Sequence, residues 1–351
     1  VALTPPGLER CFYADNGSSA IEVALKMSFH HWLNLGRKTK TKFITLENSY
    51  HGETLGALAV GNVELYRDTY GPLLMETISV PSPDCYQREQ GESCRAYSER
   101  MFEPMKRALE RHADETSAVI LEPLVQCAGY MRMYHPVYLK LLREACNHYG
   151  VHLIADEIAV GFGRTGSMFA CEQAGISPDF MCLSKGLTGG YLPLATVLTT
   201  ATVYESFYDN YDTLKAFLHS HSYTGNALGC RAARATLDIF RDDEVIQRNA
   251  GLATAMQQAT ASFSEHPHVA EVRQQGMILA IEMVKDKSNR TPYPWQERRG
   301  LTVYRHGLEN GVLLRPLGNV VYFMPPYIIS EAQIKQVADV AWQGIQLATS
   351  G

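Results

Sequence analysis

The sequence predicts an α/β protein, with a large domain built on a mostly parallel central sheet and a smaller α+β domain at the C-terminus. Short apolar runs recur along the first two thirds of the chain, as at 118–121, 151–155 and 180–183, and each stops at a polar residue. Stretches with helical spacing separate these runs, which is the pattern of a parallel sheet covered on both faces. After about residue 240, strand-like runs follow one another directly, as in an α+β unit.

The first 240 residues alternate expected strands with expected helices, and we assign 1–240 to the large domain. The expected strands are 9–14, 42–46, 118–121, 151–155, 180–183 and 194–199. The expected helices are 20–36, 95–112, 136–149 and 227–240. Pro104 is expected to kink the second helix or to mark a new start. The turn-rich stretch 61–94 is expected to be connection and surface.

Residues 241–351 form the expected small domain. It begins with a helical run at 245–263 and contains a further helix near 295–310. Its expected strands are 269–276, 277–284, 311–315 and 320–326. A last helix is expected to start at Ser330, because Gln333 completes a capping box with it.

Composition and charge exclude several classes of function. The 351 residues carry a net charge of −5, which gives no electrostatic footprint for nucleic acid or for an anionic membrane. No run of 18 apolar residues occurs, so no membrane span is expected. None of the eight cysteines forms a C-x-x-C pair and several lie in apolar runs. We therefore expect buried thiols of a cytoplasmic protein, without a disulfide framework or a zinc site.

Two of the expected strands each end in one ionisable residue. The run 151–155 is followed by Asp156, and the run 180–183 is followed by Ser184 and Lys185. Ligands of parallel sheets bind beyond the carboxyl ends of the strands. An acid and an amine there suit pyridoxal phosphate (PLP), because Lys can bond to its aldehyde and Asp can keep its ring nitrogen protonated. Taken alone, such residues are more often two exposed charges after two strands.

Two earlier segments fit the same cofactor. Gly17 and Ser18 form a turn between a strand and a helix, where free backbone N–H groups meet the positive helix end and make an anion site. A plain serine N-cap is the alternative. Tyr50 follows the strand 42–46, where an aromatic ring can stack on a flat ligand, although a tyrosine of the core or rim fits equally well.

Three later residues are candidate ligands: His219, His221 and Arg315. His219 and His221 resemble a metal pair, but no third ligand stands at a suitable spacing, so no metal site is predicted. Arg315 ends an apolar strand, which suggests a bidentate clamp on a substrate carboxylate. A structural salt bridge is the alternative for Arg315.

Six separate blocks of the sequence resemble the class III (ω-amino acid) aminotransferases of PLP fold type I, in matching order over essentially the whole chain. The blocks are DNGSSA at 15–20, SYHG at 49–52, EPL at 122–124, ADEIAVGFGRTG at 155–166, LSKGLTGG at 183–190 and HSYTGN at 221–226. The spacing between Asp156 and Lys185 also fits this family. The resemblance implies a PLP-dependent aminotransferase.

The resemblance also implies roles for residues of the cofactor site. Lys185 would bond to the cofactor and act as general acid and base, and Asp156 would pair with its ring nitrogen. Tyr50 would stack near the ring and border the substrate. Gly17 and Ser18 would bind the phosphate.

Further residues follow from the same resemblance. Ser222 falls where the partner subunit reaches the phosphate in this family, which implies a homodimer. Glu122 would lie close to the cofactor and support the residues around it. Arg164 would help to shape the substrate site.

Three blocks are similar to the biotin-pathway branch of the family: 129–136, 156–176 and 313–328. This similarity implies that Arg315 holds the carboxylate of a keto acid substrate and that Tyr322 lines the same pocket. The implied reaction converts 8-amino-7-oxononanoate to 7,8-diaminononanoate. The expected amino donor is S-adenosylmethionine, and lysine stays open because some relatives use it.

Other readings stay open as well. The substrate could be another ω-amino acid such as 4-aminobutyrate or ornithine, and PLP isomerases and decarboxylases share the same Lys and Asp. Members of the family carry an N-terminal segment before the equivalent of Val1 that completes the small domain. That part is expected to be missing here, by truncation or disorder, so an inactive, truncated dimer partner is a further alternative.

Overall fold

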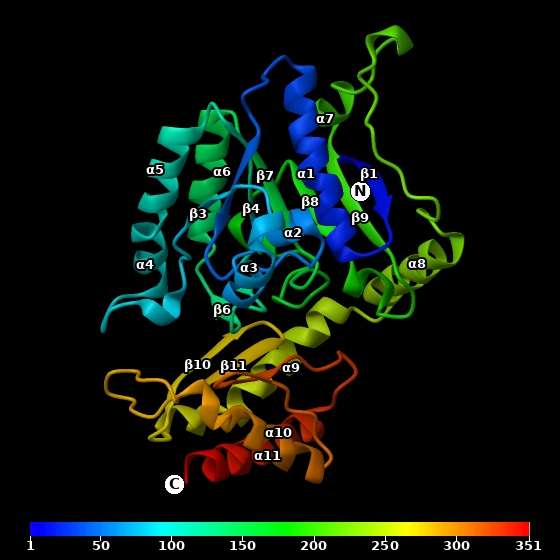
Figure 1. The fold of residues 1–351 in the computed structure, drawn as a ribbon. Coiled ribbons are helices and arrows are strands. Elements are labelled where there is room, and N and C mark those ends of the chain that lie inside the picture. The colour runs from blue at the N-terminus through cyan, green and yellow to red at the C-terminus, as the bar shows by residue number, and fades with distance from the viewer. Residues whose placement is uncertain (351) are drawn as a thin grey trace. The chain divides into compact units, whose positions relative to one another are not determined.

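The computed structural model describes residues 1–350, which form two compact units (Figure 1). Unit 1 contains residues 1–162 and 168–240, and unit 2 contains residues 163–167 and the chain from Arg241 onward. The segment 163–167, predicted from the sequence as part of the large domain, therefore belongs to unit 2.

Unit 1 is built around a seven-stranded sheet with the order β1-β9-β8-β7-β4-β2-β3. Its strands are β1 (Leu8–Ala14), β2 (Lys42–Leu46), β3 (Ile78–Val80), β4 (Thr116–Leu121), β7 (His152–Asp156), β8 (Phe180–Leu183) and β9 (Ala195–Thr200). All neighbours from β3 to β8 are parallel, whereas β9 is antiparallel to both β8 and β1. The predicted, mostly parallel sheet is thus confirmed. A separate hairpin pairs β5 (Val125–Gln126) with β6 (Arg132–Met133).

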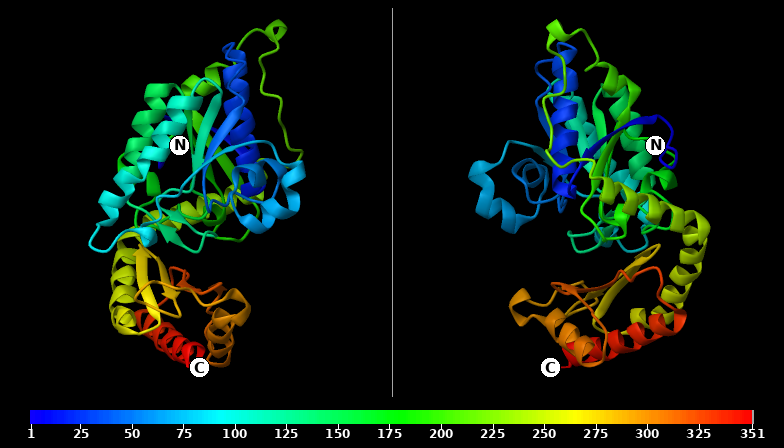
Figure 2. Two further views of the ribbon diagram at one scale, coloured as in Figure 1. Left: turned by 60° about the vertical axis from the view of Figure 1, so that its left-hand side comes forward. Right: turned by 90° about the vertical axis from the view of Figure 1, so that its right-hand side faces the viewer.

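Helices cover both faces of this sheet, as Figure 2 shows. Helix α1 (Gly17–Asn34) lies on one face, and α4 (Cys94–Arg100), α5 (Phe102–His112) and α6 (Val137–Tyr149) lie on the other. Every residue of β4 and β7 is consequently buried. The remaining helices of this part are α2 (Leu55–Val60), α3 (Glu64–Tyr70), α7 (Ala201–Glu205) and α8 (Ala227–Asp242).

Pro104 marks a new helix, as one of the two sequence-based options proposed. Helix α4 ends at Arg100 and α5 begins at Phe102, so that Pro104 occupies the first turn of α5. Proline is tolerated there because the first turn has no intrahelical acceptor for its missing N–H.

Unit 2 has a four-stranded antiparallel sheet and three longer helices. The sheet order is β10 (Val269–Gln275), β11 (Ile278–Met283), β13 (Val320–Phe323) and β12 (Pro316–Leu317). The helices are α9 (Val245–Ala259), α10 (Arg299–Glu309) and α11 (Glu331–Thr349). The predicted capping box is confirmed at the start of α11, where the Ser330 hydroxyl accepts from the Gln333 backbone and the Gln333 side chain accepts from the Ser330 backbone.

Two strand predictions were wrong. The stretch 61–94 contains β3, which pairs with β2 at the sheet edge but is only three residues long and therefore gives no clear alternating pattern. Residues 311–315 do not form a strand, because pairing with β13 is limited to Pro316 and Leu317. Arg315 therefore immediately precedes the paired segment.

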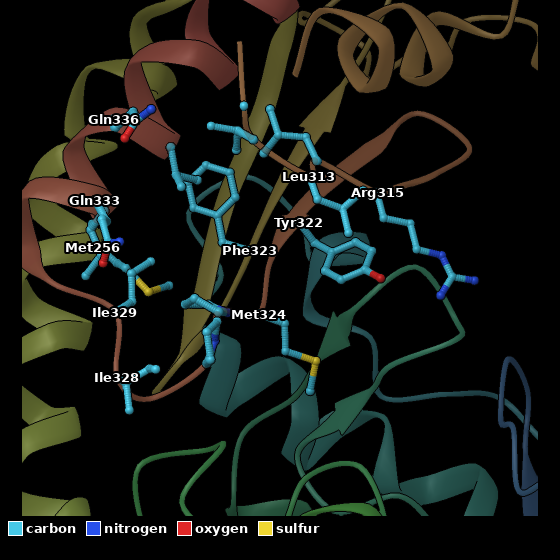
Figure 3. Close-up of a pocket in the computed structure, with 17 residues that line it drawn as sticks. Met256, Leu313, Arg315, Tyr322, Phe323, Met324, Ile328, Ile329, Gln333 and Gln336 are labelled. Carbon is cyan, nitrogen blue, oxygen red and sulfur yellow. The ribbon is translucent and has the colours of Figure 1, made fainter. Parts of the chain in front are cut away.

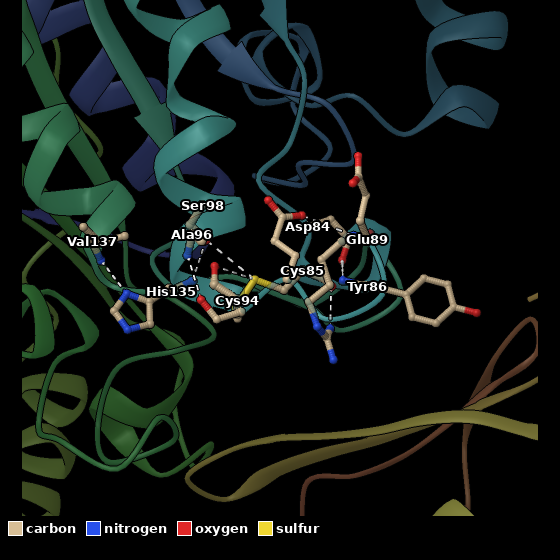
Figure 4. The surroundings of a disulfide bond; sticks show 12 residues. Asp84, Cys85, Tyr86, Glu89, Cys94, Ala96, Ser98, His135 and Val137 are labelled. Atoms are coloured by element: carbon tan, nitrogen blue, oxygen red, sulfur yellow. Dashed lines mark hydrogen bonds between the residues drawn. A yellow bond between two sulfur atoms is a disulfide. The ribbon is translucent and has the colours of Figure 1, made fainter.

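The cysteine prediction was also wrong for one pair. Cys85 and Cys94 form a disulfide with a Cα–Cα distance of 5.3 Å, within the usual range for this bond (Figure 4). The bond closes a short loop between Asp84 and the start of α4, where the Asp84 carboxylate accepts from the Tyr86 backbone. The other six cysteines remain thiols, and Cys146, Cys171 and Cys182 are buried. A spacing of nine residues carries no sequence signal for pairing.

No helix in the part of the chain that the structure describes is both long enough and apolar enough to cross a membrane.

Candidate functional site

A pocket of about 280 Å³ lies at the carboxyl ends of β7 and β8, within unit 1. This volume is close to the lower end for ligand pockets, about 300 Å³. Six residues predicted from the sequence line it together: Gly17, Ser18, Tyr50, Glu122, Asp156 and Lys185. The remaining lining residues are Asn16, His51, Gly52, Cys127, Ala128, Ile158, Ala159 and Ser184.

Asp156 and Lys185 reach the pocket because their strands are parallel neighbours. Asp156 is the last residue of β7 and is paired in register with Cys182 of β8. Lys185 follows β8 after one residue, and its backbone has a φ of 43°, in the left-handed region that non-glycine residues rarely adopt. Asp156 is buried, whereas Lys185 is exposed. The site therefore presents a buried carboxyl and an accessible amine.

The start of α1 forms the other wall. Asn16 is the N-cap, and its side chain accepts from the Ser19 backbone at 3.0 Å. The alternative of a serine cap is therefore wrong, and the Ser18 hydroxyl instead accepts from the Glu53 backbone at 3.2 Å. The first N–H groups of an 18-residue helix lie at this wall, and they favour an anion.

Tyr50 and Glu122 lie side by side through a backbone contact. One Glu122 carboxyl oxygen accepts from the Tyr50 N–H at 3.2 Å, and the other accepts from the Cys127 N–H at 3.1 Å. Burial raises the pKa of Glu122 to about 7. Burial, with a hydrogen bond to Glu53, raises the pKa of Tyr50 to about 12, so its hydroxyl keeps its proton. Near neutral pH, Glu122 is thus close to its titration midpoint.

His51 also belongs to the site, but it is not among the site residues predicted from the sequence. Its Nδ1 lies 2.7 Å from the Asp156 Oδ2, and both side chains are buried. The other Asp156 oxygen accepts from the Ile158 N–H at 3.1 Å. The available signal was the position of His51, directly after Tyr50 at the end of a strand.

Arg315 and Tyr322 lie together in unit 2. Both line a largely apolar cavity of about 640 Å³, and Figure 3 shows the guanidinium of Arg315 beside the hydroxyl end of Tyr322. Arg315 is exposed and has no ion pair within residues 1–350, so the structural salt bridge considered from the sequence is not found there. An exposed guanidinium at the rim of an apolar cavity is suited to a ligand with a carboxylate and an aliphatic chain.

Arg164 and Ser222 lie outside both cavity walls. The Arg164 guanidinium donates to the Pro325 carbonyl at 2.6 Å and lies 4.4 Å from the centre of the Tyr327 ring, within unit 2. Ser222 is exposed in the long segment between α7 and α8, which runs along the outside of unit 1 (Figure 1). Neither residue joins the pocket of Lys185 within a single chain.

His219 and His221 face each other with their Nε2 atoms 3.1 Å apart, and Lys26 approaches His219 at 3.0 Å. Within residues 1–350, no group of three or more His, Cys, Asp or Glu side chains is arranged to hold a metal ion.

The sequence matches a known protein family over nearly its whole length. The family model described as aminotransferase class-III matches residues 1–343. A curated adenosylmethionine-8-amino-7-oxononanoate aminotransferase of Geobacter sulfurreducens is 43% identical over 350 residues, which cover 99% of this chain and 77% of the relative. The enzyme of the same name from Helicobacter pylori is 48% identical over 334 residues, covering 94% of this chain and 73% of the relative.

Solved structures agree with these sequence matches. The crystal structure of adenosylmethionine-8-amino-7-oxononanoate aminotransferase from Methanocaldococcus jannaschii superposes with a TM-score of 0.92 at 38% identity. The match covers 100% of this chain and 78% of that one. The similarity therefore extends over both units of the chain.

Proposed function

This chain belongs to the class III aminotransferases, and on that basis we propose that it transfers an amino group to 8-amino-7-oxononanoate. Replacing the oxo group at carbon 7 by an amine gives 7,8-diaminononanoate, a step of biotin biosynthesis. The names of the relatives that are 43% and 48% identical support this substrate and support S-adenosylmethionine as the donor. Lysine is the alternative donor. The observation that carries the proposal is the convergence of Lys185, Asp156 and the Gly17–Ser18 turn on one pocket.

The cofactor of this family is PLP, and the residues present fit it. A carboxyl, an amine and a helix start line one pocket, matching a ring nitrogen, an aldehyde and a phosphate. A Cβ added at Gly17 would meet Ile158 at 3.2 Å, so glycine keeps this wall open. Bound PLP supplies an electron-accepting ring that lets a proton leave the carbon beside the amine nitrogen.

We assign the steps around the cofactor to three side chains. Lys185 would hold the cofactor at its aldehyde, and its amine would move the proton as general base and acid. Asp156 would pair with the ring nitrogen of the cofactor and would favour its protonated form. Tyr50 borders the ring and the substrate, and its protonated hydroxyl donates to Glu53.

Glu122 and the Gly17–Ser18 turn position the backbone around the cofactor pocket. The Glu122 carboxyl anchors the backbone of Tyr50 and Cys127 by accepting from both N–H groups. Gly17 and Ser18 present N–H groups and a hydroxyl to the phosphate. Arg164 anchors the segment 163–167 by donating to the Pro325 carbonyl. Because Pro325 lines the larger cavity, this hydrogen bond helps to shape that cavity's wall.

Arg315→Ala is expected to raise the KM for 8-amino-7-oxononanoate about 10- to 100-fold, with a small change in kcat, because we assign the keto acid carboxylate to Arg315 and Tyr322. Arg315→Lys keeps the charge but loses the two-pronged contact, so it should recover only part of the affinity. Steady-state kinetics with each substrate varied in turn measures both effects.

The matched control is Arg305→Ala, an exposed arginine on α10 that does not line the cavity. It should leave the KM unchanged. An unchanged KM in Arg315→Ala would remove Arg315 from substrate binding. Turnover of 4-aminobutyrate or ornithine, with none of 8-amino-7-oxononanoate, would assign the chain to another activity of the family.

We also propose a homodimer in which Ser222 serves the site of the partner subunit. The segment around Ser222 exposes large apolar side chains that a monomer would leave in water, among them Tyr208 (77% exposed), Tyr211 (95%) and Tyr223 (88%). Ser222 is exposed in the same segment and does not line its own chain's pocket. A second copy of the chain would cover these exposed tyrosines and would place Ser222 at a pocket of the partner subunit.

Subunit mixing tests this proposal. Ser222→Ala should weaken PLP binding about tenfold, because a hydrogen bond to an anion is lost. If Ser222 acts across the interface, mixed dimers of Ser222→Ala and Lys185→Ala subunits contain one site with neither change, and activity returns. If Ser222 acts in its own chain, every site has one change, and activity measured at a PLP concentration near the wild-type dissociation constant stays low. A monomer in sedimentation analysis would also contradict the proposal.

A cytoplasmic location is supported by the six cysteines that remain thiols, although the Cys85–Cys94 disulfide is of a kind that is rare in that compartment. Alkylation in denaturant at the moment of cell lysis tells whether Cys85 and Cys94 are bonded in the cell: eight labelled cysteines would fit a reducing compartment, and six would contradict it.

A further inference from the structure

We propose that His51 is a positioning residue that fixes the Asp156 carboxylate in the direction of the cofactor ring nitrogen. This inference rests on the proposed function, because it assumes that Asp156 faces PLP. It adds a role for the histidine, which acts through Asp156 and not by taking part in the chemistry.

The contact between the two residues is short and dry. The His51 Nδ1 lies 2.7 Å from the Asp156 Oδ2, and the two side chains are 0% and 5% exposed. The Asp156 Oδ1 accepts from the Ile158 N–H at 3.1 Å. With one donor on each oxygen, the carboxylate cannot rotate without losing a buried hydrogen bond.

This geometry also determines which His51 nitrogen holds a proton. An ionised carboxylate can only accept hydrogen bonds, so the proton in this contact must be on the His51 Nδ1. Donation to the charged form stabilises the Asp156 anion, which is the form that can pair with a protonated ring nitrogen. Loss of His51 therefore acts on both the direction and the charge of Asp156.

The backbone around His51 is fixed from both sides. The Tyr50 N–H donates to Glu122 at 3.2 Å. Gly52 has a φ of 126° and packs so closely against Ser18 that no side chain fits there. The backbone on each side of His51 is thus held by contacts that do not involve Asp156.

One nitrogen of His51 differs from the other in its surroundings. Among the described residues, the buried Nε2 lacks a hydrogen-bond partner, although His51 lines the pocket. A buried polar atom without a partner destabilises a fold. A histidine at this position is therefore a poor choice for stability alone, and the contact with Asp156 gives it a role in the pocket wall.

The charged groups that face His51 are Asp156, in direct contact, and Glu122, whose carboxyl interacts with both electrostatically. Without the His51 donor, the Asp156 carboxylate accepts one hydrogen bond fewer, which changes how strongly it stabilises a protonated ring nitrogen. A change at His51 should alter how the absorbance of the bound cofactor depends on pH, which a purely structural role would not do.

The test compares His51→Leu, which removes the donor, with His51→Asn, whose amide can donate from a place close to that of Nδ1. The matched control is His31→Asn. His31 is also buried and also uses Nδ1, which lies 2.9 Å from the Ser206 Oγ, but it lies about 20 Å along α1 from the pocket. For each protein we would measure PLP dissociation from the apo form, the pH titration of the visible absorbance of bound PLP, and urea unfolding of the apo form.

We expect His51→Leu to raise the PLP dissociation constant about tenfold or more and to shift the pH titration, and His51→Asn to recover most of both. His31→Asn should lower the unfolding midpoint and change neither cofactor property. The inference would be overturned if His51→Leu bound PLP and titrated with pH as the wild-type protein does. It would also be overturned if His31→Asn lost as much PLP affinity as His51→Leu. If the wild-type protein itself gains no visible absorbance with PLP, the proposed function fails instead, and the two failures are distinguishable.

Discussion

Lys185→Ala is expected to abolish turnover while the protein keeps its fold. The amine is the group that we assign to bond with the cofactor and to move the proton, and no neighbouring amine lines the pocket. Acid–base catalysis by a placed group contributes about 10²- to 10⁴-fold, and the covalent role adds to this. We therefore expect kcat to fall by at least about 10⁴-fold. The side chain is exposed, so its removal leaves no cavity in the core.

The backbone of Lys185 provides a second readout. Its φ of 43° is unfavourable for residues with a Cβ, by about 1–2 kcal/mol, and favourable for glycine. Lys185→Gly should therefore be as inactive as Lys185→Ala but should unfold at an equal or higher urea concentration. Strain of this kind, at the residue assigned to the chemistry, is typical of functional sites.

Steady-state kinetics and urea unfolding of the apo proteins measure these effects. Lys140→Ala on α6 is the control, since Lys140 is also exposed but does not line the pocket, and it should behave as wild type. More than about 1% of wild-type kcat in Lys185→Ala would exclude Lys185 from the proton transfer. A lower unfolding midpoint in Lys185→Gly than in Lys185→Ala would contradict the strain argument.

The central sheet was predictable because burial on both faces leaves a strong pattern. In β4, β7 and β8 every residue is buried, and each strand appears in the sequence as an apolar run that stops at a polar residue. β3 was missed because three residues at a sheet edge are too few to show a period. Within residues 311–315, Val312 and Leu314 are buried, yet the stretch pairs with no strand. Hydrophobicity reports burial there, not pairing.

The candidate site was predictable where its residues end a strand or begin a helix. Asp156 and Lys185 come together because parallel strands place their ends at one edge, and Gly17 stands at the start of a helix. His51 was missed because its role depends on a contact with a residue 105 positions away, which no local pattern contains. The Cys85–Cys94 bond was missed for the related reason that spacing alone does not determine whether two cysteines meet.

Gly52→Ala is expected to have the second largest effect, because Gly52 follows the Tyr50–His51 segment and packs directly against Ser18 of the Gly17–Ser18 turn. Gly52 has a φ of 126°, and a Cβ there would lie 2.1 Å from the Ser18 Oγ and 3.0 Å from the Ser18 Cα. The backbone strain costs about 1–3 kcal/mol, and the overlap adds about 1–3 kcal/mol. We expect the unfolding free energy to fall by at least about 2 kcal/mol and the PLP dissociation constant to rise tenfold or more, about 1.4 kcal/mol.

Two companion variants separate strain from displacement of the turn. Gly36→Ala is the matched control, since Gly36 has a φ of 77° but nothing within 4 Å of an added Cβ. It should lose about 1 kcal/mol of unfolding free energy through strain and leave PLP binding unchanged. Adding Ser18→Gly to Gly52→Ala removes the contacts with the serine side chain. It should therefore restore part of the stability but not the affinity, because the hydroxyl for the phosphate is gone. Wild-type PLP affinity in Gly52→Ala would show that the α1 turn does not depend on this contact and would place the phosphate elsewhere.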